Sequence, residues 1–384
     1  MRYFLVAGEP SGDRLGAALM AGLKQLDPEA AFFGVGGPLM TAEGLTSLFP
    51  MQELSVMGIA EVLPKYRQLR RRVIETAHAA VASDAAALIT IDSPDFCLRV
   101  AKRVRAAAPK IRTIHYVAPS VWAWRPGRAV RMARHIDQVL ALLPFEPPYM
   151  EAAGMRCDFV GHPVVAEKQA DAAAIADFRA RHGLGDAPFV LVLPGSRRSE
   201  IARLAAPFGA ALTLALRARP EYRVVVPTLA HLADDLAGLT ADWPGRPIIL
   251  AQGADKVAAF GGAQAALAAS GTVSLELAAA HTPMVIAYDL NWLSWKIMRR
   301  MARIDTVTLV NLVTGSRAIP EFLGPDCTPA AIATALGQLF DDPAARMAQQ
   351  AAMADTMQAL GQGDAPPGLR AARAVLAGLG QAFA

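Results

Sequence analysis

Cysteine is scarce in this sequence, and its placement argues against two kinds of scaffold. The 384 residues include three cysteines, Cys97, Cys157 and Cys327, which are far apart and odd in number. This spacing favours neither a disulfide framework nor a zinc cluster. Unclustered cysteine is typical of a reducing compartment, so we expect a cytoplasmic protein.

The chain also lacks an apolar run of the kind that crosses a membrane. Its longest uncharged stretch, residues 257–275, is broken by Gln264 and by the Ser-Gly-Thr segment 270–272. Residues 1–7 are followed at once by Glu9 and Asp13, and no small-residue cleavage site follows, so we do not expect a signal peptide. We therefore expect a protein that is soluble or lies on a membrane surface.

Neither disorder nor charge of one sign dominates the composition. Apolar residues make up 53% of the chain and charged residues 19%, which is too apolar for a disordered protein. The formal net charge of +4 is too small an excess to indicate a nucleic-acid-binding protein. At about 150 residues per domain, the length predicts two domains or one large one.

Short, continuously apolar segments alternate with helical patterns along the whole chain. Such segments are typical of strands buried on both faces, and strand–helix alternation predicts a doubly wound parallel sheet. Two series of strands predict an α/β protein with two Rossmann-like domains that face each other across a cleft. The predicted strands are 3–7, 31–35, 87–91, 113–117, 139–143 and 158–160, then 189–193, 223–226, 248–250, 265–268 and 284–287.

A polar stretch after Gly161 separates the two series. We predict an N-terminal Rossmann-like domain over residues 1–165 and a C-terminal one over 166–342. Residues 343–384 are rich in Ala and weakly periodic, which predicts a C-terminal helical tail. Ligands of open α/β sheets bind at the carboxyl ends of the strands, so we expect the site there.

The loop over residues 193–199 has the residue types of a diphosphate site. It follows a strand, opens a helix and contains Gly195, Ser196 and Arg197. Glycine lets the backbone come close to a phosphate, while the hydroxyl and the guanidinium donate hydrogen bonds. The Gly-Lys-Ser/Thr ending of a P-loop is absent, so this is a different kind of anion loop.

A second loop of this kind contains Ser270, Gly271 and Thr272. Glu276 lies about one turn into the following helix, where its carboxylate could accept hydrogen bonds from both ribose hydroxyls. The alternative is an ordinary acid on a helix surface. Because both loops fall in the second half, we expect that half to bind the nucleotide.

The first loop of the chain contains Glu9, Ser11, Gly12 and Asp13 between a strand and a helix. Its two carboxylates would repel a diphosphate. The residues favour recognition of a substrate hydroxyl or capping of the helix.

Asp92 stands at the carboxyl end of the third predicted strand, where reactive groups lie in this architecture. A carboxylate there can act as a general base. The alternative is that Asp92 or Asp95 caps the next helix. A metal-binding pair is less favoured, because no third ligand lies nearby in the sequence.

Two stretches are strongly basic. Residues 99–134 contain ten Lys and Arg and no acid, and a second basic cluster over 65–72 follows the apolar segment 56–63. Basic residues beside apolar ones suit an anionic membrane surface, and an ordinary solvated helix face is the alternative.

Residues 292–303 predict an amphipathic helix whose basic face lies opposite an apolar one. This pattern is typical of a helix at a membrane interface, and a core-packed helix with a basic outer face gives the same pattern. The predicted membrane-contact residues are Trp292, Trp295, Lys296, Arg299, Arg300 and Arg303.

A series of short segments carries a family resemblance: 7–13 (AGEPSGD), 57–61 (MGIAE), 92–96 (DSPDF), 115–125 (HYVAPSVWAWR), 143–146 (LPFE), 161–163 (GHP), 193–197 (LPGSR) and 269–276 (ASGTVSLE). Each is weak alone, but in this order they are highly specific. Together they resemble the lipid-A-disaccharide synthases, a family of two-Rossmann (GT-B) glycosyltransferases. Pro10 stands where that family more often has Thr.

The resemblance implies an inverting transfer of 2,3-diacylglucosamine from UDP to the 6-hydroxyl of 2,3-diacylglucosamine 1-phosphate, giving the β-1,6-linked lipid A disaccharide 1-phosphate and UDP. It implies no cofactor and no metal, since the UDP-sugar is a substrate. It further implies a peripheral protein on the anionic inner face of the inner membrane that does not bind nucleic acid, and it is compatible with a homodimer.

The resemblance also assigns residues. Asp92 would be the general base, and Asn311 would lie near the donor. Ser11, Gly12 and Asp13 would line the acceptor side. Two alternatives stay open: a UDP-sugar epimerase, which would not need apolar patches or a basic amphipathic helix, and a non-enzymatic peripheral protein that binds anionic lipid.

Overall fold

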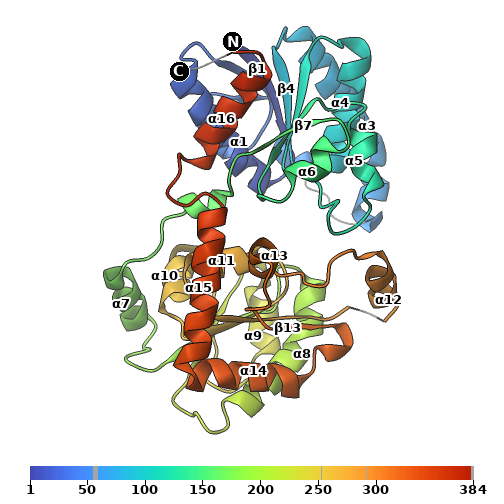
Figure 1. The fold of residues 1–384 in the computed structure, drawn as a ribbon. Helices are drawn as coiled ribbons and strands as arrows, with labels where there is room; N and C mark the ends of the chain where they lie inside the picture. The colour runs from blue at the N-terminus through green and yellow to red at the C-terminus, as the bar shows by residue number, and fades with distance from the viewer. Residues whose placement is uncertain (55–58, 252, 291, 382–384) are drawn as a thin grey trace. The chain divides into compact units, whose positions relative to one another are not determined.

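A computed structural model describes residues 1–54, 59–251, 253–290 and 292–381, and Figure 1 shows its ribbon. The chain forms two compact units: unit 1 contains residues 1–166 and 360–384, and unit 2 contains residues 167–359. Each unit is an open parallel sheet between layers of helices, as the alternating sequence pattern predicts.

Unit 1 is built on a sheet that has seven strands in the described residues, in the order β3-β2-β1-β4-β5-β6-β7. All of the paired strands are parallel. The strands are β1 (Arg2–Ala7), β2 (Ala31–Val35), β3 (Thr46–Ser47), β4 (Ala87–Ile91), β5 (Arg112–Tyr116), β6 (Gln138–Ala141) and β7 (Arg156–Phe159). The helices are α1 (Pro10–Leu26), α2 (Pro38–Ala42), α3 (Ile59–Ala82), α4 (Pro94–Ala107), α5 (Gly127–Met132), α6 (Pro147–Glu151) and α16 (Pro367–Gly378).

The two faces of this sheet carry separate hydrophobic cores. Successive side chains of a strand point to opposite faces, so Tyr3 and Leu5 of β1 pack on the side of α1 and α16. Phe4 and Val6 pack on the side of α3, α4 and α5. Burial on both sides explains why the strands read as unbroken apolar runs.

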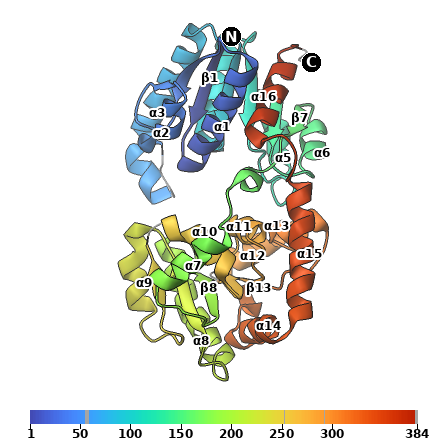
Figure 2. The same cartoon turned by 90° about the vertical axis from the view of Figure 1, so that its left-hand side faces the viewer.

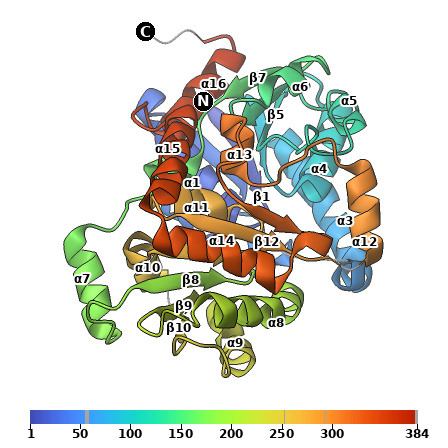
Figure 3. The same ribbon diagram turned by 60° about the horizontal axis from the view of Figure 1, so that its bottom comes forward.

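Unit 2 has a sheet of six strands in its described residues, in the order β10-β9-β8-β11-β12-β13. Helices α8 and α14 pack against each other and share one core with β8, β9 and β11 (Figure 3). The strands are β8 (Phe189–Leu193), β9 (Arg223–Pro227), β10 (Ile248–Leu250), β11 (Ala265–Ala268), β12 (Met284–Tyr288) and β13 (Glu321–Leu323). The helices are α7 (Ala172–Arg181), α8 (Arg198–Ala215), α9 (Ala233–Leu239), α10 (Lys256–Gly262), α11 (Val273–Ala279), α12 (Trp292–Met301), α13 (Leu309–Thr314), α14 (Pro329–Asp341) and α15 (Pro343–Ala359).

Every strand that the sequence predicts is confirmed, with ends within two residues of the predicted ones. The prediction missed β3 and β13, which are the outer strands of their sheets and have two and three residues. Strands this short and partly polar carry no apolar run that a sequence pattern can detect.

The prediction of a separate tail over 343–384 is wrong, because the segment divides between the units. Gln349 of α15 fixes α15 to unit 2: it accepts from the Met284 amide at 2.7 Å and donates to the Met284 carbonyl at 3.1 Å. Helix α16 lies beside α1 in unit 1 (Figures 1 and 2). A Cβ at Gly368 would stand 2.4 Å from the Ala18 carbonyl oxygen, so glycine permits this close helix contact.

Within the part of the chain that the structure describes, no helix is both long enough and apolar enough to span a bilayer.

Candidate functional site

A cavity of about 500 Å³ opens in unit 2 at the carboxyl ends of β8, β9, β10 and β11. The sheet order reverses direction between β8 and β11, and open α/β sheets bind their ligands at such a switch point. The two loops that the sequence predicts for the nucleotide follow these two neighbouring strands. The predicted residues that line the cavity are Gly195, Ser196, Arg197, Ser270, Gly271, Thr272 and Glu276.

The loop after β8 is held in shape by Glu200, a residue that the sequence analysis missed. The Ser196 amide donates to one carboxylate oxygen of Glu200 at 3.1 Å, and Arg197 donates to the other at 3.1 Å. Gly195 has φ +117, and a Cβ there would lie 2.6 Å from the Cβ of Glu200, so only glycine fits. The sequence did contain a signal for this role, since Glu200 is an acid in the first turn of a helix, where acids bind backbone amides.

The hydroxyl of Tyr288 also donates to Glu200, at 3.2 Å. Burial raises the pKa of Tyr288, and the negative charge of Glu200 raises it further. Tyr288 therefore stays a neutral donor that helps to position the Glu200 carboxylate.

The loop after β11 brings Glu276 to the cavity, where it forms an ion pair with Lys256. Its side chain is 32% exposed, so it is not the free surface acid that was the alternative. Lys256 also lines the cavity and was not predicted. It places a cation beside the carboxylate that we expect at the ribose.

Thr228, at the end of β9, lines the same cavity and was missed as well. Its hydroxyl oxygen is buried and has no hydrogen-bond partner among the described residues. A buried polar atom without a partner is unfavourable by about 1–3 kcal/mol, so an unpaired hydroxyl at a cavity wall indicates a place for a ligand group.

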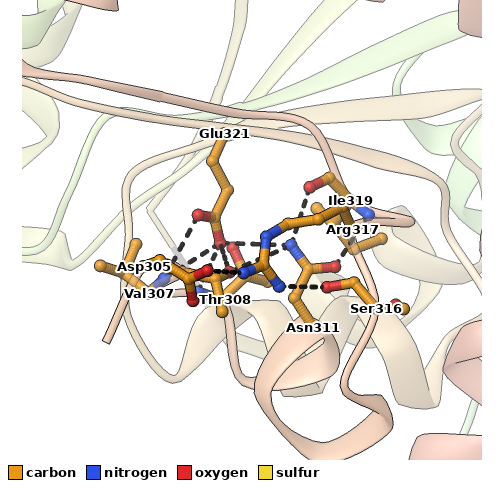
Figure 4. A network of polar contacts seen from close by, with 9 residues as sticks. Asp305, Val307, Thr308, Asn311, Ser316, Arg317, Ile319 and Glu321 are labelled. Atoms are coloured by element: carbon orange, nitrogen blue, oxygen red, sulfur yellow. Dashed lines mark hydrogen bonds and ion pairs between the residues drawn. The ribbon is translucent and has the colours of Figure 1, made fainter. Parts of the chain in front are cut away.

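Asn311 does not line the cavity, and its place near the donor stays a prediction. It is fully buried on α13, and its amide nitrogen donates to the Ile319 carbonyl at 2.9 Å and to Thr306 at 3.2 Å. Its carbonyl oxygen accepts from the Ile319 amide at 3.0 Å. Figure 4 shows this network around Glu321, which accepts from Thr306, Thr308 and Asn311. With these partners, Asn311 holds the turn that leads into β13.

The corresponding switch point of unit 1 lies between β1 and β4, where the strand order again reverses. Asp92 directly follows β4, and Ser11 in the first turn of α1 donates to its carboxylate at 3.4 Å. Asp92 and Ser93 have φ of +51 and +41, which is unusual for two consecutive residues that are not glycine. Such backbone conformations cluster at functional sites, which favours the catalytic interpretation of Asp92.

Asp13 is a structural residue, which corrects its predicted place on the acceptor side. Its carboxylate is 2% exposed and accepts the backbone amides of Gly37, Leu39 and Met40 at 2.9–3.0 Å. These are unpaired amides at the start of α2, so Asp13 caps that helix from a distance in sequence. Gly12 is buried against Ala7 and Ile91, which leaves Ser11 as the exposed side chain of the three predicted residues.

The amphipathic helix α12 follows the prediction in part. Lys296, Arg299, Arg300 and Arg303 are exposed. The ring of Trp295 lies over Gly324, where a Cβ would come within 2.6 Å, so Trp295 packs within unit 2 and is only partly exposed. The side chain of Trp292 lies outside the described residues.

The basic cluster over 65–72 is also only partly described, since residues 55–58 and the side chains of 59–65 lie outside the described part. Arg72 forms ion pairs with Glu53 and Glu75 at 2.8 Å. It is therefore not a free cation for a membrane surface.

The described residues hold no group of three or more His, Cys, Asp or Glu that could bind a metal ion. The positive groups at the nucleotide cavity are Arg197 and Lys256.

The two units, each built on an open parallel sheet with a switch point, place the chain in the class of two-Rossmann proteins. Solved structures of this fold include the UDP-GlcNAc 2-epimerase from Neisseria meningitidis bound to UDP-GlcNAc, with a TM-score of 0.65, 11% identity and coverage of 91% of this chain and 94% of that one. The calicheamicin glycosyltransferase CalG4 has a TM-score of 0.57 and 17% identity, and covers 100% of this chain and 99% of that one.

Sequence comparison then identifies the family. The family model for lipid-A-disaccharide synthetase matches residues 3–367. The lipid-A-disaccharide synthase of Ruegeria pomeroyi is 63% identical over 98% of this chain and 95% of its own length, and that of Rhodospirillum centenum is 49% identical over 97% and 93%. The chain belongs to the lipid-A-disaccharide synthase family. Membership decides against both alternatives, the epimerase and the non-enzymatic lipid-binding protein.

Proposed function

We propose that the chain is an inverting hexosyltransferase that joins UDP-2,3-diacylglucosamine and 2,3-diacylglucosamine 1-phosphate into the lipid A disaccharide 1-phosphate. The observation that carries the proposal is the cavity of unit 2, where donor-rich loops after β8 and β11 meet at one switch point. Family membership supports the substrate pair and the β-1,6 linkage.

On the donor side, the hydroxyl of Ser196, the amides near Ser196 and Gly271 and the guanidinium of Arg197 would bind the diphosphate. Glu276 would accept hydrogen bonds from the ribose hydroxyls while Lys256 balances its charge. As the sugar leaves, negative charge develops on the diphosphate, and donors fixed in advance stabilise it. These groups can neutralise that charge without a divalent metal.

On the acceptor side, Asp92 would accept the proton of the 6-hydroxyl as its oxygen attacks the anomeric carbon. One carbon–oxygen bond forms, the bond from that carbon to the diphosphate breaks, and UDP leaves with the electron pair. A single displacement converts an α-linked donor into a β-linked product. Ser11 would orient the carboxylate through its 3.4 Å hydrogen bond.

We also propose that the protein works as a peripheral enzyme on an anionic, cytoplasm-facing membrane surface. Arg299, Arg300 and Arg303 of the α12 segment are exposed beside Met298 and Met301, whose side chains are 41% and 37% exposed. Basic and apolar side chains on one exposed segment suit the surface from which acylated substrates come.

The test is a disaccharide assay of Asp92→Asn with both acylated substrates. General base catalysis contributes about 10²–10⁴-fold, so we expect turnover to fall by that factor while thermal unfolding stays unchanged. Asn tolerates a positive φ, which makes the variant compatible with the loop.

Asp84→Asn is the matched control, since Asp84 lies just before β4, is exposed and has φ +52. Its rate should equal that of the wild type. Normal turnover in Asp92→Asn would remove Asp92 from the reaction, and a wild type that releases no UDP from the acylated pair would contradict the proposed function.

A further inference from the structure

Unit 1 contains a second cavity, of about 570 Å³, that the proposed mechanism does not use. It is an open hollow lined by the first turns of α4, by α5 and by the segment that joins β5 to α5. This volume falls in the range of small-molecule sites.

Positive charge dominates the wall of this cavity. Its cationic side chains are Arg99, Lys102, Arg125, Arg128 and Arg131, and its one carboxylate is Asp95. In the described part of the chain, none of these five cations has a carboxylate within 4.0 Å.

Three other arginines of the same unit have a carboxylate partner. Arg72 pairs with Glu53 at 2.8 Å, Arg105 with Asp137 at 2.5 Å, and Arg156 with Asp158 at 2.9 Å. The cavity brings five cations without a carboxylate partner among the described residues to one place, although their mutual repulsion destabilises the fold. Such an arrangement is expected where a ligand supplies the missing negative charge.

The wall also has an apolar part. Leu98, Trp124 and Met132 line it, and the guanidinium of Arg125 lies 4.3 Å from the centre of the Trp124 ring. His135 completes the wall. Burial lowers its pKa, and the charge of Lys102 lowers it further, so His135 is neutral at pH 7 and can donate a hydrogen bond.

Two residues of the cavity wall closely follow Asp92 in the sequence. Pro94 and Asp95 line the cavity, and Pro94 is two residues after Asp92. Two consecutive peptide units place the Cα atoms of Asp92 and Pro94 at most about 7.6 Å apart. A hexose can therefore present one end to Asp92 and the opposite end to the cavity.

We propose that this cavity binds the phosphate monoester of the sugar acceptor while the far hydroxyl of that sugar meets Asp92. The assignment rests on the proposed function and adds the site that recognises the acceptor phosphate. A phosphate monoester carries a charge of about −1.5 to −2 at pH 7, and arginines bind it through paired hydrogen bonds. The volume of the cavity and its Trp124 side chain suit a phosphosugar.

The experiment measures acceptor preference in detergent micelles that contain no phospholipid. The double variant Arg128→Gln, Arg131→Gln is assayed with 2,3-diacylglucosamine 1-phosphate and with the same acceptor lacking its phosphate. We expect KM for the phosphorylated acceptor to rise at least tenfold, KM for the UDP-sugar to stay unchanged, and the preference in kcat/KM for the phosphorylated acceptor to fall toward one.

Arg103→Gln is the matched control, because Arg103 is exposed on the same helix α4 but does not line the cavity. It should keep the wild-type preference. Lys102→Gln, a single change on the cavity wall, repeats the test if the double variant does not fold, and it should lower the preference in the same direction.

A second experiment distinguishes the phosphate of the acceptor from the phosphate of a lipid headgroup. Sedimentation with phosphatidylglycerol vesicles should give equal binding for the wild type and the double variant. Unchanged preference in the cavity variants would overturn the proposal, and loss of vesicle binding with that preference intact would assign the cavity to a lipid headgroup. A wild type that makes no disaccharide with either acceptor would instead contradict the proposed function.

Discussion

At the scale of single residues, the loop after β4 shows how the fold holds Asp92. The amide of Asp92 donates to the Tyr116 carbonyl at 2.9 Å, and the Ser93 carbonyl accepts the amides of Phe96 and Cys97 at 3.0–3.1 Å. These bonds stabilise two left-handed residues, each unfavourable by about 1–3 kcal/mol. The backbone of Asp92 is therefore fixed by the fold.

His115 gives a residue-scale prediction for pH. Burial and, to a smaller extent, the charge of Arg128 lower its pKa to about 4, and the ring contacts Thr90 at 2.8 Å. The unfolded chain binds a proton near pH 6.5 and the folded chain does not, so stability falls as the pH drops from about 6.5 toward 4. Urea unfolding of the wild type should lose about 2 kcal/mol between pH 7 and pH 5 through this group.

In His115→Gln that part of the loss should disappear, even if the variant is less stable at every pH. The readout is therefore the difference between the two pH values. An equal loss in both proteins would show that His115 is protonated in the folded state.

At the scale of elements, the loop after β8 and the N-terminus of α2 illustrate two uses of polar side chains. The first loop directs Ser196 and Arg197 to a cavity, and Arg197 is 60% exposed. The N-terminus of α2 offers no group to a ligand through Asp13, because the Asp13 carboxylate is occupied by backbone amides of the protein.

Arg197→Gln should weaken UDP binding by about 10–100-fold, since a hydrogen bond to a charged group contributes about 1.5–3 kcal/mol. Calorimetric titration with UDP measures it. Arg198→Gln is the control, because Arg198 is 73% exposed, pairs with Asp235 and does not line the cavity. Equal affinity of the two variants would show that Arg197 does not bind the diphosphate.

Asp13→Ala should destabilise unit 1 by about 2–4 kcal/mol, because three amides at the start of α2 lose a charged acceptor. Chemical unfolding measures the change. The KM for the acceptor should stay unchanged in the protein that remains folded. A normal unfolding free energy with a raised acceptor KM would restore Asp13 to the acceptor side.

At the scale of the whole molecule, the chain returns to its first unit at the end. Helix α16 packs on α1 through glycines on both helices: a Cβ at Gly22 would meet the Gly368 carbonyl oxygen at 2.6 Å. Ala371, Val375 and Leu376 of α16 then complete the core around Leu19 and Leu23. Unit 1 therefore depends on residues that the chain adds last.

Gly368→Ala should destabilise unit 1 by about 1–3 kcal/mol, because the added methyl group meets a backbone oxygen that cannot move aside. Hydrogen exchange should rise in α1 and α16 and stay unchanged in α8 and α14. Gly337→Ala in α14 is the control, since its Cβ would meet only Arg219 at 3.8 Å. That variant should be as stable as the wild type or slightly more stable, as alanine favours helix interiors.

The sequence by itself determined every strand except the short edge strands β3 and β13, the strand–helix alternation, the two loops predicted for the nucleotide and the position of Asp92. Each of these depends on local properties: apolar periodicity, glycine at a tight loop, and a polar residue where a strand ends.

The tertiary structure decided which polar side chains remain available for a ligand. Asp13 and Asn311 have suitable chemistry for a site, but the fold places backbone donors and acceptors around them. Lys256 and Thr228 line the cavity of unit 2 because the strand order places their segments beside β8. The basic cavity of unit 1 likewise combines segments that are separate in the sequence. A side chain's partners come from distant parts of the chain, so its role follows from the fold rather than from its neighbours in sequence.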